Sequence, residues 1–94
     1  MTIDQLNTFL MVVKCRSFHG AAKGLFLSQP SITSRIQALE HELNVTLFVR
    51  QGRGIRLSEQ GEKLVPIAKR MVKMCNKAHE LGVANENVHD SSEI

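Results

Sequence analysis

The connection Phe26-Leu27-Ser28 constrains the fold of this chain more than any other segment, because helical patterns lie directly on both sides of it. The helix before this connection can be capped by Ser17 at its N-terminus. The apolar residues after Ser17 recur at the i, i+3, i+4, i+7 spacing of a short amphipathic helix. These apolar residues are Phe18, Ala21, Ala22 and Leu25. The two adjacent alanines are small and therefore permit close packing against another helix.

A second helix is predicted directly after the connection. Ser28 can cap it, and Pro30 falls in its first turn, where the missing N–H is harmless. Asn44 supplies a left-handed C-cap, so the helix ends near residue 43. Two short helices joined in this way are the core of a helix-turn-helix, whose second helix enters the major groove of DNA by its N-terminal end. The buried face of this second helix is formed by Ile32, Ile36, Leu39 and Leu43.

Two further elements are predicted around this helix pair. Residues 3–14 form an amphipathic helix that begins at a capping box of Thr2 and Gln5. Residues 47–50 and 55–57 are short β-compatible runs, and the turn between them contains two glycines. These two runs are expected to form a small hairpin, the wing of a winged helix.

The last predicted element is a long helix. Ser58 caps it, Glu59 and Glu62 place negative charge in its first turn, and an apolar pattern continues to Leu81. The chain therefore divides into a winged helix-turn-helix domain over residues 1–57, a linker or dimerisation helix over 58–82 and a flexible tail over 83–94. The fold class is mainly α, with a three-helix core and a two-stranded β wing.

The polar face of the helix over residues 29–43 is the predicted DNA-reading surface. At 100° per residue, the face opposite its buried stripe carries small hydroxyls and amides instead of the Lys and Glu that are typical of a solvated helix. Such side chains pair with base edges, and an arginine at the flank suits a phosphate or a guanine. The alternative is that these residues only solvate a surface helix. The candidates are Gln29, Pro30, Ser31, Thr33, Ser34, Arg35 and Gln37.

Basic side chains of the predicted wing form a second candidate site. Arg50, Arg53 and Arg56 lie within one hairpin, with no acidic residue between them. One alternative is a charged edge that discourages aggregation of exposed strands. Contact with flanking phosphates or the minor groove explains the charges better, because the hairpin directly follows the recognition helix in the sequence.

Composition narrows the class of protein. The chain has 94 residues, of which 43% are hydrophobic, and this suits one small globular domain. Lys and Arg number 12 against 9 acidic residues, and because three of the acids lie after residue 82, residues 1–82 carry a formal charge of +6. A basic body is a weak indication of a polyanionic partner.

The sequence gives no support for catalysis or metal binding. The four histidines are scattered, and the two distant cysteines, Cys15 and Cys75, have no metal-ligand spacing and are expected to be reduced thiols. No nucleophile stands with a histidine and an acid in a catalytic arrangement. We therefore expect no enzymatic activity, no metal and no cofactor. No signal segment and no membrane-spanning run occurs, so we expect a cytoplasmic protein, associated with the nucleoid by DNA binding and without a membrane partner.

A set of spaced residues runs through about residues 2 to 81: Ser17-Phe18, Ala21-Ala22, Leu25, Ser28-Gln29-Pro30-Ser31-Ile32-Thr33, Ile36, Leu39-Glu40, Leu43, Leu47-Phe48, Arg50, Leu57-Ser58 and Gly61. Together these residues resemble the N-terminal domain of LysR-type transcriptional regulators. The resemblance implies that Gln29, Pro30, Thr33 and Ser34 reach bases and backbone in the major groove, and that Arg50 and Arg53 serve in the wing. Ser34 stands where the family frequently has Arg, Arg35 follows it, and Gln37 replaces a usual basic residue, so the operator sequence does not carry over.

The helix over residues 58–82 carries a continuous apolar seam that predicts a homodimer. An adjacent apolar stripe, which includes Ala68 and Val72, can pack on the helix's own domain. Resemblance to LysR-type proteins implies an antiparallel pairing of the two helices, with both recognition helices addressing an inverted-repeat operator. In heptad terms the two core positions of the seam are filled by Leu64, Met71 and Ala78 and by Ile67, Met74 and Leu81.

The predicted function is sequence-specific binding of double-stranded DNA as a LysR-type transcription regulator. The alternative is a protein-interaction module that forms mixed dimers with a full-length relative, and a gel-shift experiment discriminates between the two. LysR-type regulators hold their effector in a longer domain that would follow the linker helix. We therefore expect no small-molecule effector site in this chain.

Overall fold

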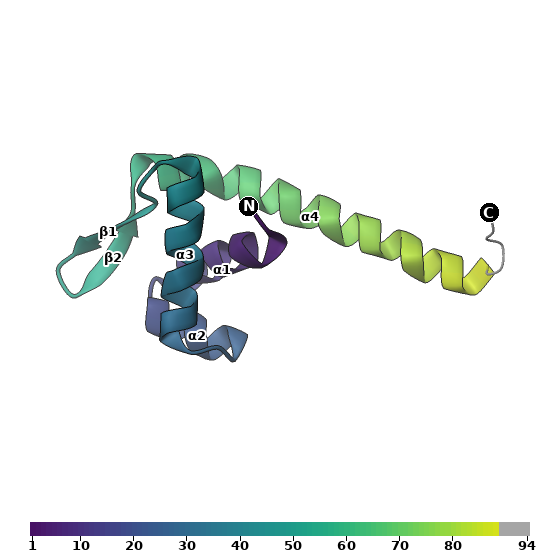
Figure 1. Cartoon of the computed structure of the whole chain (residues 1–94), viewed down its shortest axis with the longest axis horizontal. Helices are drawn as coiled ribbons and strands as arrows, with labels where there is room; N and C mark the ends of the chain where they lie inside the picture. The colour runs from purple at the N-terminus through teal and green to yellow at the C-terminus, as the bar shows by residue number, and fades with distance from the viewer. Residues whose placement is uncertain (89–94) are drawn as a thin grey trace.

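The computed structural model describes residues 1–88, with side-chain surroundings given for residues 1–82. Three helices and a hairpin form the winged body, and a fourth, long helix leaves it (Figure 1). This arrangement confirms the predicted fold class. The elements are α1 (Ile3–Cys15), α2 (Phe18–Leu25), α3 (Gln29–Leu43), β1 (Phe48–Gln51), β2 (Gly54–Leu57) and α4 (Glu59–Val88).

The first three helices begin at side-chain caps, as predicted. Thr2 and Gln5 form a reciprocal capping box at α1, with both hydrogen bonds at 3.0 Å. Ser17 Oγ accepts from the Gly20 N–H at 2.7 Å at the start of α2, and Ser28 Oγ accepts from the Ser31 N–H at 3.3 Å at the start of α3. These bonds satisfy N–H groups that have no partner within the first helical turn.

Each of these three helices ends at a single C-cap residue whose backbone adopts the left-handed helical conformation. These C-cap residues are Arg16, Phe26 and Asn44, with φ values of 56°, 57° and 56°. The predicted role of Asn44 is therefore confirmed. A left-handed cap turns the chain sharply away from the helix axis, which allows α2 and α3 to follow their predecessors after very short connections.

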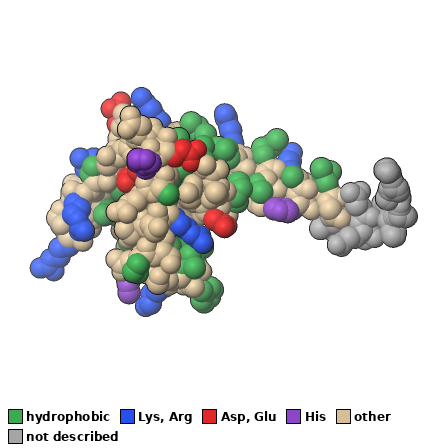
Figure 2. All heavy atoms as spheres, viewed as in Figure 1, with side chains coloured by type: hydrophobic (Ala, Val, Ile, Leu, Met, Phe, Trp, Pro, Cys, Tyr) green, Lys and Arg blue, Asp and Glu red, His purple; other side chains and the backbone are tan. Residues whose placement is uncertain are grey.

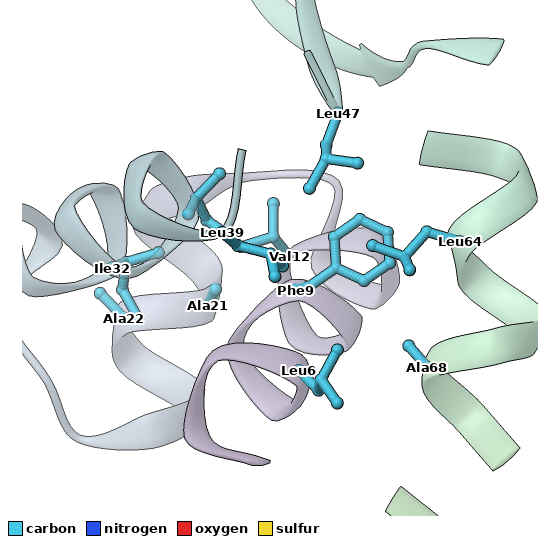
Figure 3. Packing of buried hydrophobic residues seen from close by; sticks show 11 residues of the cluster. Leu6, Phe9, Val12, Ala21, Ala22, Ile32, Leu39, Leu47, Leu64 and Ala68 are labelled. Atoms are coloured by element: carbon cyan, nitrogen blue, oxygen red, sulfur yellow. The ribbon is translucent and has the colours of Figure 1, made fainter. Parts of the chain in front are cut away.

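The core lies where α1 meets the other helices. The Phe9 ring is fully buried and points toward Leu64 of α4 (Figure 3). Phe9 also lies 5.5 Å from Phe48 of β1, and Phe48 lies 5.8 Å from Phe18 in an edge-on contact, both between ring centroids. These aromatic contacts attach the hairpin to the helical body. The buried apolar set is Leu6, Phe9, Val12, Ala21, Ala22, Ile32, Ile36, Leu39, Leu47, Leu64 and Ala68.

The wing is a two-stranded antiparallel hairpin in which Arg50 lies opposite Ile55 and Val49 lies opposite Arg56. Gly52 occupies the turn with a φ of 60°, a conformation that suits glycine. Because neighbouring residues on a strand point to opposite faces, Arg50 and Ile55 share one face of the hairpin, and Arg56 belongs to the other.

The helix α4 begins at Ser58, whose Oγ accepts from the Gly61 N–H at 2.9 Å. It continues to Val88, so the predicted helix end at residue 82 is wrong. Gly82 interrupts the apolar pattern, but one glycine costs only about 1 kcal/mol relative to alanine and does not stop a helix. The predicted tail therefore begins within α4, and its remaining residues, 89–94, lie outside the described part. None of the described helices is both long and apolar enough to cross a membrane.

One face of α4 packs against the winged body. Leu64 and Ala68 are buried, and Val65 and Val72 pack against them at the edge of the core. The stripe predicted to pack on the helix's own domain does so at these positions. Leu64 was predicted to lie in the dimer seam, and this assignment is wrong, because its side chain is only 8% exposed inside its own domain.

Candidate nucleic-acid interface

An open groove of about 460 Å³ lies between α3, the wing and the start of α2. Its α3 wall carries Gln29, Thr33 and Gln37, which follow one another at intervals of four residues and therefore share one side of the helix. The facing wall carries Arg50 and Arg53 of the wing. The structure thus brings together two sets of residues that the sequence analysis selected separately.

The polar groups of this groove are available to a ligand. Gln29, Gln37, Arg50 and Arg53 are exposed, and Thr33 is half-buried beside the buried face of α3. Amides and a hydroxyl on one wall can pair with base edges, whereas the guanidinium groups on the other suit phosphates. The α3 wall also contains the N-terminal turn of the helix, the part that enters a major groove in helix-turn-helix proteins.

Four other candidates on α3 do not line the groove. Pro30 and Ser34 are exposed outside it, and the Ser31 hydroxyl lies 2.9 Å from that of Ser28 at the helix cap. Arg35 donates from Nη1 to Thr8 Oγ1 of α1 at 3.2 Å and so connects two helices of the domain. The groove-facing side is therefore rotated toward the wing, relative to the face predicted from helical periodicity alone.

Arg56 is separated from the other two arginines of the wing. It borders a second hollow of about 450 Å³ behind the hairpin, which Gln51 and Glu62 also line. Its Nη1 donates to the Leu57 carbonyl oxygen at 3.3 Å. The predicted trio of wing arginines therefore divides into Arg50 and Arg53 at the groove and Arg56 on the opposite face.

Two basic residues beside the groove were not among the predicted site residues. Arg16 and His19 line it from the turn between α1 and the start of α2. Arg16 is also the left-handed C-cap of α1, a conformation that turns the chain away from the axis of that helix. The only sequence signal was a basic residue next to the Ser17 cap. Arg16 and His19 are far in sequence from the wing. They lie beside it because α1 packs in the same core as α3 and the start of the wing.

Glu40 was also missed as a site residue, and among the described residues it is the one acidic side chain that lines the groove. Its Oε2 accepts from the Leu47 N–H at 2.7 Å and from the Phe48 N–H at 3.4 Å. These bonds hold the start of β1 against the C-terminal half of α3. The carboxylate therefore connects the two walls of the groove.

The described residues contain no group of three His, Cys, Asp or Glu side chains that could hold a metal ion. Cys15 and Cys75 are both free. The polar side chains that line the groove can form hydrogen bonds and ion pairs with a ligand.

The family model of bacterial regulatory helix-turn-helix proteins of the lysR family matches residues 3–62. The chain belongs to this family. The HTH-type transcriptional regulator HdfR of Salmonella newport (strain SL254) is 38% identical over 94 residues, which are 100% of this chain and 34% of that protein. The chain thus spans about a third of the length of the curated relatives that it matches.

Solved structures of LysR-family DNA-binding domains have the same fold. The CbnR DNA-binding domain in complex with DNA is 35% identical, with a TM-score of 0.84 over 92% of this chain and 99% of that chain. The BenM DNA-binding domain in complex with catB site 1 DNA is 27% identical, with a TM-score of 0.87 over 96% of this chain and 100% of that chain. The family and its relatives are transcriptional regulators.

The predicted dimer seam is exposed on α4 beyond the winged body. Leu81 and Met74 are 67% and 64% exposed, Ile67 is 50% exposed and Met71 is 37% exposed. Ala78 lies between them on the same side and is also exposed. Apart from Leu64, all predicted seam residues are therefore accessible to a partner.

Proposed function

We propose that this chain is the DNA-binding part of a LysR-type transcription regulator and binds double-stranded DNA in a sequence-specific manner. The observation that carries the proposal is the groove, in which Gln29, Thr33 and Gln37 of α3 face Arg50 and Arg53 of the wing. In this arrangement α3 lies in the major groove and the wing reaches the flanking backbone or minor groove.

The two walls have different tasks. Thr33 and the two glutamines contact base edges, where a glutamine can pair bidentately with adenine. Arg50 and Arg53 neutralise phosphates and so contribute affinity that depends little on sequence. Arg16 and His19 add positive or hydrogen-bonding groups at the edge of the same groove. Glu40 does not repel the DNA strongly, because its charge is directed at two backbone N–H groups.

A homodimer through α4 completes the proposal. The accessible seam of Ile67, Met71, Met74, Ala78 and Leu81 gives a partner helix an apolar surface, and the family resemblance favours antiparallel pairing. Two winged bodies related by twofold symmetry address the two halves of an interrupted inverted repeat. The flexible methionines and the small Ala78 make this contact weaker than a leucine-rich one.

Solved relatives in complex with DNA support this function over a pure protein-interaction module. A module that only forms mixed dimers would not need the basic groove, whereas a DNA-binding domain would use it to contact phosphates. A DNA-binding regulator acts where the chromosome is, and on this ground we propose a cytoplasmic location.

Selection of duplexes from a random pool with the purified chain tests the proposal. We expect enrichment of an interrupted inverted repeat and a shifted band whose affinity for that repeat exceeds that for random duplex by about a thousandfold or more. The Arg53→Ala variant should weaken binding to both duplexes, whereas Arg56→Ala, on the other face of the hairpin, serves as the matched control. Failure to enrich any sequence, or an effect of Arg56→Ala equal to that of Arg53→Ala, contradicts the proposal.

A further inference from the structure

The helix α4 has a strongly basic face that neither the groove nor the apolar seam uses. Between Glu62 and Glu80 the sequence contains no acidic residue, but it contains five lysines and arginines, Lys63, Lys69, Arg70, Lys73 and Lys77. All five side chains are exposed. Lys63 pairs with Glu59 at 3.6 Å, one helical turn away. Within the described residues, the other four have no carboxylate within 4.0 Å.

The spacing of these four cations costs the helix stability. Lys69 and Lys73, and likewise Lys73 and Lys77, are four residues apart, where like charges repel and destabilise a helix. A helix that only needs a soluble surface alternates acids and bases at this spacing, as Glu59 and Lys63 do here. The uninterrupted positive charge therefore indicates an anionic partner for this face.

The face points away from the winged body. At 100° per residue, the basic side chains lie roughly opposite the side of α4 that buries Leu64 and Ala68 in the core. Figure 2 shows blue side chains, with green ones between them, along the upper edge of α4, while most of the winged body lies below and to the left. The groove of the same chain lies between α3, the wing and the start of α2, on the side of the winged body and away from these cations.

The apolar seam lies between the core-facing side and the basic face, next to the basic face. Antiparallel pairing through the seam consequently places the basic faces of both helices on one flank of the dimer and both winged bodies on the other. The dimer then has a DNA-binding side and an opposite side that is strongly positive. The positive charge of that side suits an acidic protein segment that docks while DNA is bound.

We propose that Lys69, Arg70, Lys73 and Lys77 form a docking surface for an acidic segment of another protein. The proposal goes beyond DNA binding and is tested with the full chain and a fluorescent oligoglutamate peptide as the probe. Replacing Lys73 and Lys77 with Gln removes two charges and preserves helix propensity. The matched control replaces Lys14 and Lys23, two exposed lysines near the ends of α1 and α2, with Gln.

In anisotropy titrations without DNA, Lys73→Gln with Lys77→Gln should weaken peptide binding about fivefold, and the control pair should change it less than twofold. Lys73→Arg with Lys77→Arg keeps the charge and should bind like the wild type, and circular dichroism verifies that each variant is folded. Equal losses in the two Gln variants would overturn the proposal.

A second titration separates a protein partner from DNA. Protein saturated with the selected duplex should still bind the peptide, and the Lys73→Gln, Lys77→Gln variant should bind that duplex with unchanged affinity. Displacement of the peptide by the duplex, or a loss of duplex affinity as large as the loss of peptide affinity, would assign the basic face to DNA and refute docking of a protein there. The duplex affinity is measured independently, so failure of this inference leaves the proposed function intact.

Discussion

Glu40 connects the two walls of the groove by hydrogen bonds to the start of β1. Its carboxylate accepts from two N–H groups at the start of β1, and the shorter of these bonds, at 2.7 Å, belongs to the fully buried Leu47. Replacement of Glu40 by Ala leaves this donor without a partner. A buried donor left unpaired costs about 1–3 kcal/mol, and we expect the free energy of unfolding to fall by that amount.

The Glu40→Gln variant retains a neutral oxygen acceptor. A hydrogen bond to a charged acceptor is about twice as strong as one to a neutral acceptor, so this variant should lose less than half of what Glu40→Ala loses. Urea denaturation followed by circular dichroism, at one fixed protein concentration, measures both losses. Glu80→Ala, which removes an exposed carboxylate from α4, serves as the control and should change stability by less than about 0.5 kcal/mol.

The same variants test whether Glu40 acts through the wing. If Glu40 holds β1 in place for DNA, Glu40→Ala should weaken duplex binding, and its effect should not add to that of Arg53→Ala. A double-mutant cycle on duplex affinity measures this coupling. Strict additivity, or a Glu40→Ala protein as stable as the wild type, would refute the argument that this carboxylate joins the two walls of the groove.

Three further predictions concern the wing, the packing of α4 and assembly. Arg53→Ala should lower the slope of log affinity against log salt by about one unit, while Arg56→Ala should leave the slope nearly unchanged; equal slopes for wild type and Arg53→Ala would mean that Arg53 is only a surface charge. Gly61→Ala should destabilise the fold, because a Cβ there would overlap the Leu47 carbonyl oxygen. Gly82→Ala, in open space within α4, should instead stabilise the fold by about 0.5–1 kcal/mol. Thermal or urea unfolding measures both changes. Met71→Glu with Met74→Glu should give a folded monomer in analytical ultracentrifugation, and Asn76→Glu, off the seam, should remain a dimer; a dimeric double variant would place the interface elsewhere.

Local signals in the sequence predicted most of the fold. Ser17, Ser28 and Asn44 each specify a helix end through their own side-chain or backbone chemistry, and the structure has all three caps at those positions. Apolar periodicity likewise identified Ile32, Ile36 and Leu39 as buried. Such features depend on residues within one or two helical turns and are therefore visible in a single sequence.

The details of the site depend on contacts between distant segments. Periodicity placed the polar face of α3 opposite its buried stripe, but the groove is bounded by the wing, whose position depends on the bond between Glu40 and Leu47. The groove therefore contains Thr33 and leaves Ser34 outside. Leu64 shows the same limit, because a heptad pattern cannot distinguish a residue that faces a partner from one that faces its own core.

The most direct test of the account is base discrimination by one side chain of the α3 wall. With the selected operator and a set of single base-pair substitutions, Thr33→Ala should lose about 1–2 kcal/mol of discrimination at one position in each half-site and keep its affinity for random duplex. Ser34→Ala, the neighbouring residue outside the groove, provides the comparison and should lose less. Unchanged discrimination at every position in Thr33→Ala, or an equal loss on operator and random duplex, would contradict the claim that this groove recognises DNA sequence.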